Sequence, residues 1–203
     1  MSSEAEEIEK KSFQFIENKI SSFPFPEREI LKRVIHATGD EDFSNLIIFK
    51  GDAIQKGIEA IKNGKHVITD VNMVKVGINS EKLMRYGGKV KCFIDKEEVF
   101  SLAEKQGITR ARAAFRLFSE ELKDNIVVIG NSPTALLELC TLILAGIRPV
   151  VVIASPVGFV NAKESKEQIL KYNVPSITVK SNKGGSTIAV AIVNALINLA
   201  EEK

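Results

Sequence analysis

Short apolar runs alternate with helical patterns along nearly the whole chain, and this alternation is the feature that most constrains the fold. The strand-like runs are rich in β-branched and apolar residues and cover 45–49, 66–71, 90–94, 125–129, 149–154 and 176–179. Between them, helical patterns cover 52–62, 96–105, 109–122, 133–145, 162–171 and 186–199. Near-continuous apolar strands that alternate with helices predict a three-layer α/β fold, in which a mostly parallel sheet carries helices on both faces.

The length and composition narrow the class of protein. The 203 residues are 44% hydrophobic and no low-complexity linker divides them, so we expect a single domain over residues 1–203. The 28 Lys and Arg residues, against 26 Asp and Glu, are spread along the chain, which argues against a nucleic-acid-binding surface. The first residues are acidic and polar, unlike a secretory signal, and the apolar runs are too short to span a bilayer. We therefore expect a cytoplasmic protein that binds neither nucleic acid nor membranes.

Cysteine and histidine are scarce. Cys92 and Cys140 lie far apart within apolar segments and are expected to be buried free thiols. His36 and His66 are the only histidines, so Cys and His cannot assemble a zinc-type cluster. The sequence therefore predicts no metal site in the protein, and any metal would arrive inside the ligand.

Three junctions in the last third of the chain place glycine and hydrogen-bonding residues at the start of a helix. They read GNSPTALLEL, SPVGFVNAKESK and KGGSTIAVAIVNAL, at 130–139, 155–166 and 183–196. Helix starts carry unpaired N–H groups and a positive dipole end, and ligands of parallel sheets bind beyond the carboxyl ends of the strands. We expect a ligand that bears carboxylates or phosphates to bind at these junctions, at Asn131, Ser132, Thr134, Gly158, Phe159, Lys183, Gly184 and Gly185.

Ordinary turn and cap chemistry explains any one of these junctions equally well. Ser132 and Pro133 suit the cap and the first position of a helix, and Asn161 with Glu164 forms a second capping pattern. The standard phosphate-binding motifs are absent, because no GxGxxG follows a strand and 57–65 has the wrong spacing for a P-loop. A nucleotide is therefore not the favoured ligand.

His36 is the candidate for acid–base chemistry. Two prolines in 24–26 mark the start of a helix and Gly39 is placed to end it, so His36 falls in the last turn. The negative end of the helix dipole and the acidic residues at 40–42 favour the imidazolium, whereas Arg33 on the same face opposes it. The alternative is a histidine that only caps a helix C-terminus.

A group of arginines follows Thr109 on one helical pattern. Arg112 and Arg116 are four residues apart and therefore neighbours on one face. A solvated charged face is the ordinary interpretation. Because Thr109 is a good helix cap, we also consider that Thr109, Arg110 and Arg116 bind carboxylates of a substrate.

The three junctions, in this order, closely resemble the precorrin-8X methylmutase family of cobalamin biosynthesis. The resemblance extends upstream to KSFQFIENK, RVIHATGDEDF, VITDVNMVKVGI and GITRARAAFR, at 11–19, 33–43, 67–78 and 107–116. It implies a flavodoxin-like sheet, a homodimer, and an isomerase that moves a methyl group from C-11 to C-12 of precorrin-8X or cobalt-precorrin-8, giving hydrogenobyrinate or cobyrinate. It implies no cofactor, and cobalt, if present, is part of the tetrapyrrole substrate.

The resemblance also assigns roles to residues. The family's catalytic histidine lies in a context that matches RVIHA, so His36 would be the general acid. Ser12, Arg33, the basic residues of 109–116 and the junctions would bind the acetates and propionates of the corrin precursor. The alternatives are a noncatalytic corrinoid- or flavin-binding module and, third, a phosphate-sugar enzyme. The lack of Trp and the presence of only two Tyr argue against a flavin module.

Overall fold

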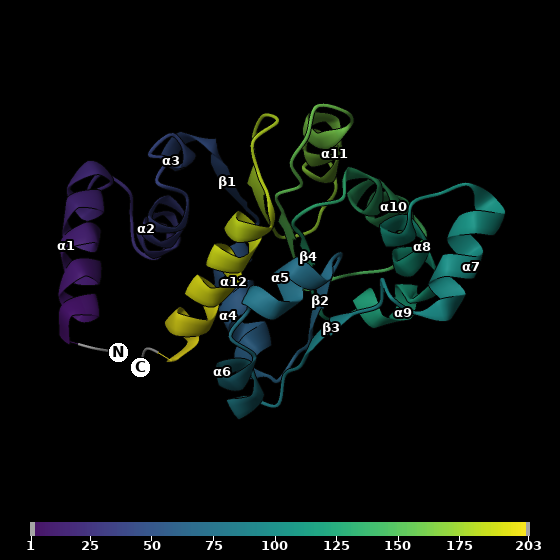
Figure 1. Cartoon of the computed structure of the whole chain (residues 1–203), viewed down its shortest axis with the longest axis horizontal. Coiled ribbons are helices and arrows are strands. Elements are labelled where there is room, and N and C mark those ends of the chain that lie inside the picture. Colours follow the sequence, from purple (N-terminus) through teal and green to yellow (C-terminus); the bar gives the residue numbers. More distant parts are fainter. Residues whose placement is uncertain (1–2, 202–203) are drawn as a thin grey trace.

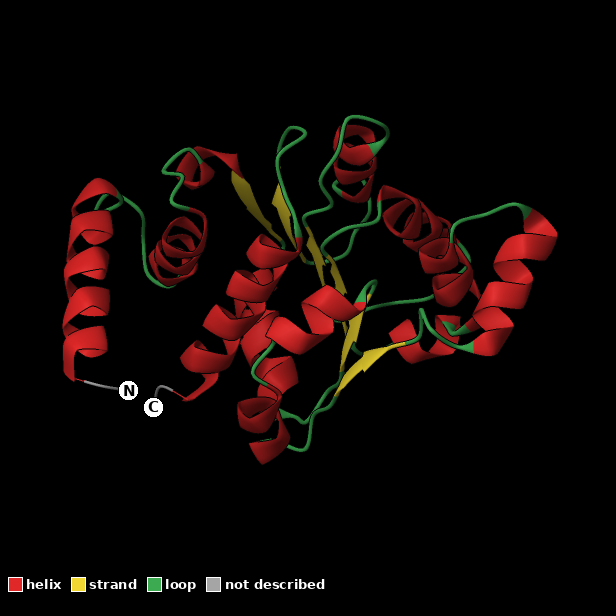
Figure 2. Cartoon of the chain, in the orientation of Figure 1, coloured by secondary structure: helices red, strands yellow, loops and turns green. Residues whose placement is uncertain are grey.

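The computed structural model describes residues 3–201, and its centre is a six-stranded sheet with helices on both faces (Figures 1 and 2). The strands are β1 (Ile47–Lys50), β2 (Val67–Thr69), β3 (Val90–Cys92), β4 (Ile126–Ile129), β5 (Val151–Ala154) and β6 (Ser176–Val179). They lie in the order β1-β6-β5-β4-β2-β3, and β1 alone is antiparallel to its neighbour. From β2 to β6 this is the strand order of flavodoxin-like folds. The predicted fold class is confirmed.

Twelve helices surround this sheet in residues 3–201. They are α1 (Ser3–Lys19), α2 (Glu27–Thr38), α3 (Phe43–Leu46), α4 (Ala53–Lys62), α5 (Asn72–Gly77), α6 (Ser80–Arg85), α7 (Glu97–Gln106), α8 (Arg110–Leu117), α9 (Ser119–Leu122), α10 (Pro133–Leu144), α11 (Ala162–Ile169) and α12 (Ser186–Glu201). In the described part of the chain, none of them combines the length and the apolar character that a membrane crossing requires.

The core divides into two main layers because side chains alternate across the strands. Ile177 and Val179 of β6 pack on the face covered by α2, α4 and α12. Val127 of β4 and Val152 of β5 belong to the opposite layer, under α10 and α11. Helix α12 packs against both the sheet and α2, and this explains why its sequence is apolar around most of its circumference.

Several local predictions are confirmed and one is wrong. Ser132 and Thr109 cap α10 and α8 through their hydroxyl groups, and Gly39 ends α2 with φ +64°. Asn161 was expected to cap α11 with its side chain, but it has φ +61° and makes no cap hydrogen bond. In that left-handed conformation its side chain does not reach the first N–H groups of the helix.

The boundaries differ from prediction where elements are short. The expected helix over 109–122 is divided by Phe118 (φ −106°, ψ 33°), whose ring stacks on Phe93 with centroids 4.3 Å apart. Residues 43–46 form α3 ahead of β1, and α5 and α6 were not predicted. Helices of four to six residues are shorter than the window in which helical periodicity becomes visible.

Candidate active site

His36 lies in the last turn of α2, as expected, and α1 fixes its orientation. The Oγ of Ser12 lies 2.9 Å from its Nδ1, and the ring of Phe13 packs at a tilt with centroids 4.8 Å apart. Ser12 and Phe13 are neighbours in α1, which packs against α2. One imidazole nitrogen is therefore held by a hydroxyl group, while Nε2 has no hydrogen-bond partner among the described residues.

A cavity of about 370 Å³ opens beside the imidazole. Its walls come from three helices that are far apart in sequence: α2 with Arg33 and His36, α5 with Met73, and α12. Asn194 joins α12 to the end of α5. Its side-chain NH₂ donates to the carbonyl of Gly77 (3.0 Å), and its side-chain oxygen accepts from the backbone N–H of Asn79 (2.9 Å). The cavity is mostly apolar, and the polar side chains of His36 and Arg33 lie at one side, where the Arg33 guanidinium also pairs with Glu9 at 3.0 Å.

The acidic residues after α2 are paired with lysines. Asp40 and Asp42 accept hydrogen bonds from the ammonium of Lys183 at 2.7 and 3.0 Å, and Glu41 pairs with Lys19. The hydrogen bond from Lys183 lowers the pKa of Asp40, and the same bonds raise the pKa of Lys183. All three carboxylates thus have lysine partners, and their effect on His36 stays a prediction. Asp40 and Asp42 tie the loop before α12 to the end of α2.

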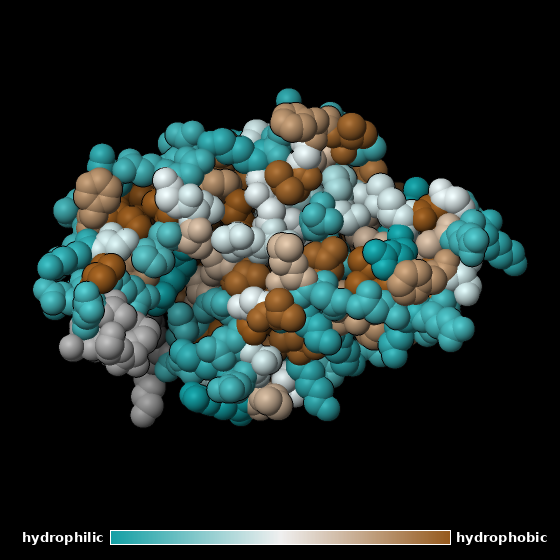
Figure 3. All heavy atoms as spheres, in the orientation of Figure 1, coloured by the Kyte–Doolittle hydropathy of each residue, from teal (hydrophilic) through white to brown (hydrophobic). Residues whose placement is uncertain are grey.

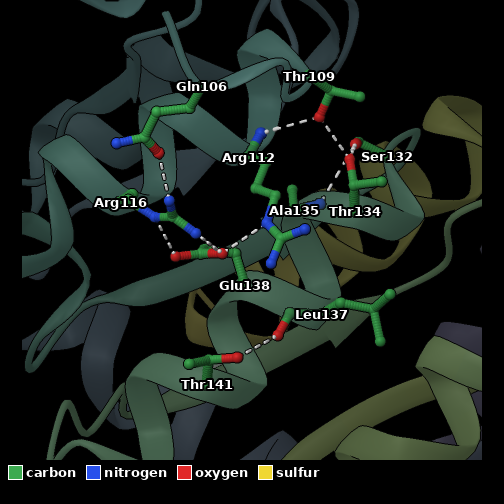
Figure 4. A network of polar contacts seen from close by, with 10 residues as sticks. All are labelled: Gln106, Thr109, Arg112, Arg116, Ser132, Thr134, Ala135, Leu137, Glu138 and Thr141. Carbon is green, nitrogen blue, oxygen red and sulfur yellow. Dashed lines mark hydrogen bonds and ion pairs between the residues drawn. The ribbon is translucent and has the colours of Figure 1, made fainter. Parts of the chain in front are cut away.

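A second polar group joins the starts of α8 and α10. The hydroxyl of Thr134 is hydrogen-bonded to those of Thr109 and Ser132, and Figure 4 shows the three oxygens in a chain. Thr109 also caps α8 by accepting from Arg112 N. Three residues that the sequence analysis proposed for ligand binding are thus brought together, on two helices.

The arginines of α8 are engaged by a buried glutamate (Figure 4). Glu138 of α10 is 3% exposed and accepts from Arg112 Nε (2.7 Å), Arg116 Nε (2.7 Å) and Arg116 Nη2 (2.9 Å). Arg116 also donates to Gln106. Burial acts to raise the pKa of Glu138, but the two guanidinium groups outweigh it and lower that pKa below its ordinary value. Arg116 is therefore committed to a structural ion pair, and Arg110 instead stacks on Phe100 at 4.8 Å.

Asp70, at the end of β2, occupies the anion-binding position of the junction after β4. Its carboxylate is buried and accepts from the N–H groups of Gly130 (3.0 Å), Asn131 (2.9 Å) and Ser132 (2.7 Å). Burial raises the pKa of this carboxyl group, and the three N–H donors act in the opposite direction by favouring the carboxylate. Asp70 was not among the predicted site residues. An aspartate directly after an apolar strand was the signal that could have found it.

One backbone donor at each of the other two junctions is also used within the chain. Gly185 N–H donates to the carbonyl of Ser155 (2.6 Å), and Gly158 N–H donates to that of Asn182 (3.2 Å). Together with the three N–H groups that bind Asp70, five backbone donors of the junctions are therefore hydrogen-bonded within the chain, and the ligand cradle stays a prediction. Phe159, which was also proposed for ligand binding, is 92% exposed at the tip of the loop before α11.

Gly130 and Gly184 allow close approach between elements. A Cβ at Gly130 would lie 2.6 Å from Cγ2 of Val74 and 2.9 Å from Cα of Ser186, so only glycine lets α5 and α12 meet the end of β4. A Cβ at Gly184 would overlap the carbonyl oxygen of Ser155. Around Gly185 (φ +127°), by contrast, there is open space.

In residues 3–201, no group of three or more His, Cys, Asp or Glu residues is placed to hold a metal ion. Both cysteines are free, Cys140 buried and Cys92 half-buried. Burial raises the pKa of the Cys140 thiol to about 12, so this thiol stays protonated and unreactive.

Comparison with known proteins decides the family. The family model described as precorrin-8X methylmutase matches residues 7–199. The chain belongs to the precorrin-8X methylmutase family. It is 45% identical over 197 residues to the cobalt-precorrin-8 methylmutase of Methanocaldococcus jannaschii, covering 97% of this chain and 90% of that protein. It is also 45% identical to the enzyme of the same name from Leptospira interrogans, covering 97% and 94%.

Solved structures agree with this assignment. The precorrin-8X methylmutase of Thermus thermophilus superposes with a TM-score of 0.87 at 36% identity, over 95% of this chain and 96% of that one. The chain is accordingly an isomerase of the methylmutase type. In this chain His36 and Arg33 line the cavity between α2, α5 and α12, and Ser12 contacts Nδ1 of His36.

Proposed function

We propose that this methylmutase moves the methyl group of precorrin-8X or cobalt-precorrin-8 from C-11 to C-12, giving hydrogenobyrinate or cobyrinate, with His36 as the general acid. The observation that carries the proposal is the position of His36, whose Nδ1 is held by Ser12 beside the cavity. In the imidazolium, Nδ1–H would donate to the Ser12 hydroxyl and Nε2–H would be left for the substrate. The names of the relatives support the substrate class.

The reaction needs little more than a positioned acid. A methyl migration within one molecule transfers no atoms to or from the protein, so the proton that assists it can return to the same group. Protonation of, or a hydrogen bond to, the ring C region would stabilise the charge that develops as the methyl group moves. Holding the macrocycle in one orientation supplies the rest of the rate enhancement. We propose no cofactor, with cobalt, if present, belonging to the substrate.

The peripheral carboxylates would bind largely to side chains, since five backbone donors of the junctions are already hydrogen-bonded within the chain. Arg33 lies beside His36, and the hydroxyl chain of Thr109, Ser132 and Thr134 lies at the start of α8 and α10. Lys183, with the glycines that follow it, would approach from the loop before α12 and would exchange its solvent-exposed pairs with Asp40 and Asp42 for a substrate carboxylate. Arg110 is the arginine of α8 that makes no ion pair among the described residues, and we assign it, rather than Arg116, to a carboxylate.

A homodimer would complete the site. A cavity of about 370 Å³ is at the small end of ligand pockets, whereas a corrin precursor with its acetates and propionates is large. Exposed apolar side chains gather over α5 and over the loop before α11 on the face seen in Figure 3, among them Met73, Val76, Phe159 and Val160. Covering such side chains with a second copy would stabilise a dimer and enclose the substrate.

The alternative is a corrinoid- or flavin-binding module without catalysis. A flavin phosphate is disfavoured, because Asp70 occupies the N–H groups at the strand-order switch point where flavodoxin-like folds bind it. The test is to incubate the purified protein with precorrin-8X and, separately, with cobalt-precorrin-8 labelled with ¹³C in the C-11 methyl group. A ¹³C methyl resonance on C-12 is the expected product. Binding without any change in the labelled position would support the noncatalytic module instead.

A further inference from the structure

Lys166 of α11 is a buried cation without an acidic partner among the described residues. The residue is 1% exposed, and its ammonium donates to the carbonyl of Lys183 at 2.6 Å. A lysine has three N–H donors, so two remain after this bond. No carboxylate lies within 4.0 Å of it in residues 3–201. A buried charge without a counter-charge is costly, and burial accordingly lowers the pKa of Lys166 to about 8.

Thr178 of β6 is the second unsatisfied group. It is 1% exposed, and its Oγ1 is buried without a hydrogen-bond partner in the described part of the chain. Ile177 and Val179 point into the core layer under α12, so Thr178 points to the opposite face, toward α11. A buried hydroxyl group without a partner costs stability, because its hydration is lost and not replaced.

Both residues line one cavity, which we call the α11 groove. Its volume is about 370 Å³, and it lies between α11, the end of β6 and the segment that follows β6. Lys163 and Lys180 add positive charge to its lining, while the one acidic residue there, Glu167, pairs with Lys163 at 3.8 Å. The groove thus combines a net positive lining with a buried ammonium that has two N–H donors left and a buried hydroxyl group that has no partner.

We propose that the α11 groove binds a small oxyanion, a phosphate or a carboxylate, through the ammonium of Lys166 and the hydroxyl of Thr178. An oxyanion supplies both the acceptors that these donors lack and the charge that the ammonium lacks. The site is separate from the cavity beside His36, and its existence does not depend on the methyl transfer. Because Lys166 also holds the carbonyl of Lys183, the anion would be linked to the loop that precedes α12.

The test is calorimetric titration of inorganic phosphate into the protein at constant ionic strength, with acetate as the second anion. Lys166→Met should weaken phosphate binding by about tenfold to a hundredfold, and Thr178→Val by about twofold to tenfold. The matched control is Lys163→Met, which removes an exposed charge from the same helix. Its small effect should disappear at higher salt.

Both test variants are expected to fold, since apolar replacement of an unpaired buried charge is neutral or stabilising, and their denaturation midpoints check this. Saturable phosphate binding that both substitutions weaken supports the site. Competition by the corrinoid product would identify a substrate carboxylate as the occupant, and lack of competition would identify a free anion. Absence of saturable binding to the wild type, or binding that survives in Lys166→Met, would overturn the proposal.

Discussion

Removal of the buried carboxylate in Glu138→Ala should destabilise the contact between α8 and α10. The carboxylate accepts three charge-assisted hydrogen bonds of 2.7 to 2.9 Å. Breaking a buried ion pair costs about 3–5 kcal/mol when the remaining charge is stranded. Here the two guanidinium side chains are each 37% exposed, so water can partly replace the lost acceptor. We therefore expect a loss of about 2–4 kcal/mol, or roughly 4–16 °C in Tm for a chain of this size.

The assay is urea and thermal unfolding of wild type and variant between pH 7 and pH 3. The arginines lower the pKa of Glu138 in the folded protein, so its stabilising effect is complete above the unfolded value of about 4.3 and is lost as pH falls toward the lower folded value. The difference between the two proteins should therefore shrink in acid. Glu121→Ala, which removes a partly exposed partner of Lys91, is the control and should cost less than about 1 kcal/mol. A difference at pH 7 no larger than that of the control, or one that is constant down to pH 3, would refute this account of Glu138.

Three further predictions address the junctions and the buried lysine. Asp70→Ala should lower both the thermal midpoint and the turnover. Added formate should restore part of each, because formate can replace the missing carboxylate at the three N–H groups. No effect of formate would contradict this. Because the pKa of Lys166 is about 8 when folded and about 10.4 when unfolded, the unfolded chain binds more protons between these values. The stability of the wild type relative to Lys166→Met should therefore rise over this pH range, and a flat or falling difference would exclude the lowered pKa. Gly184→Ala should have a lower thermal midpoint than Gly185→Ala. A Cβ at Gly184 would overlap the carbonyl oxygen of Ser155, whereas a Cβ at Gly185 would face open space. Equal midpoints would show that the loop adapts and would contradict this prediction.

The sheet and its covering helices followed from local patterns, because burial on both faces requires near-continuous apolar strands. The helix that ends at Gly39 and the cap residue Ser132 were also visible locally, since each depends on neighbours within a few positions. The antiparallel pairing of β1 with β6 was not predicted. It depends on which strand lies at the edge, and no local pattern specifies that.

The chemistry of the site was only partly predictable. His36 and Ser12 were assigned from a resemblance, and the hydrogen bond between them joins residues 24 positions apart. Asp70 and Glu138 were missed because the groups that hydrogen-bond to each carboxylate belong to another element of the fold. A carboxylate that satisfies distant N–H groups has the same sequence signature as one that faces solvent. For the same reason Lys183 appeared free, although Asp40 and Asp42 pair with it.

The most direct test of the proposed mechanism is the single-turnover rate of methyl migration in His36→Ala, measured beside wild type on the same corrin precursor. We expect the rate to fall by at least about 10²–10⁴-fold, with an unchanged unfolding midpoint and near-normal product binding, because His36 supplies a proton rather than packing. The wild-type rate should decrease as pH rises and the imidazolium loses its proton. Wild-type turnover by His36→Ala, or a wild-type rate that increases through neutrality, would contradict a general-acid role for His36.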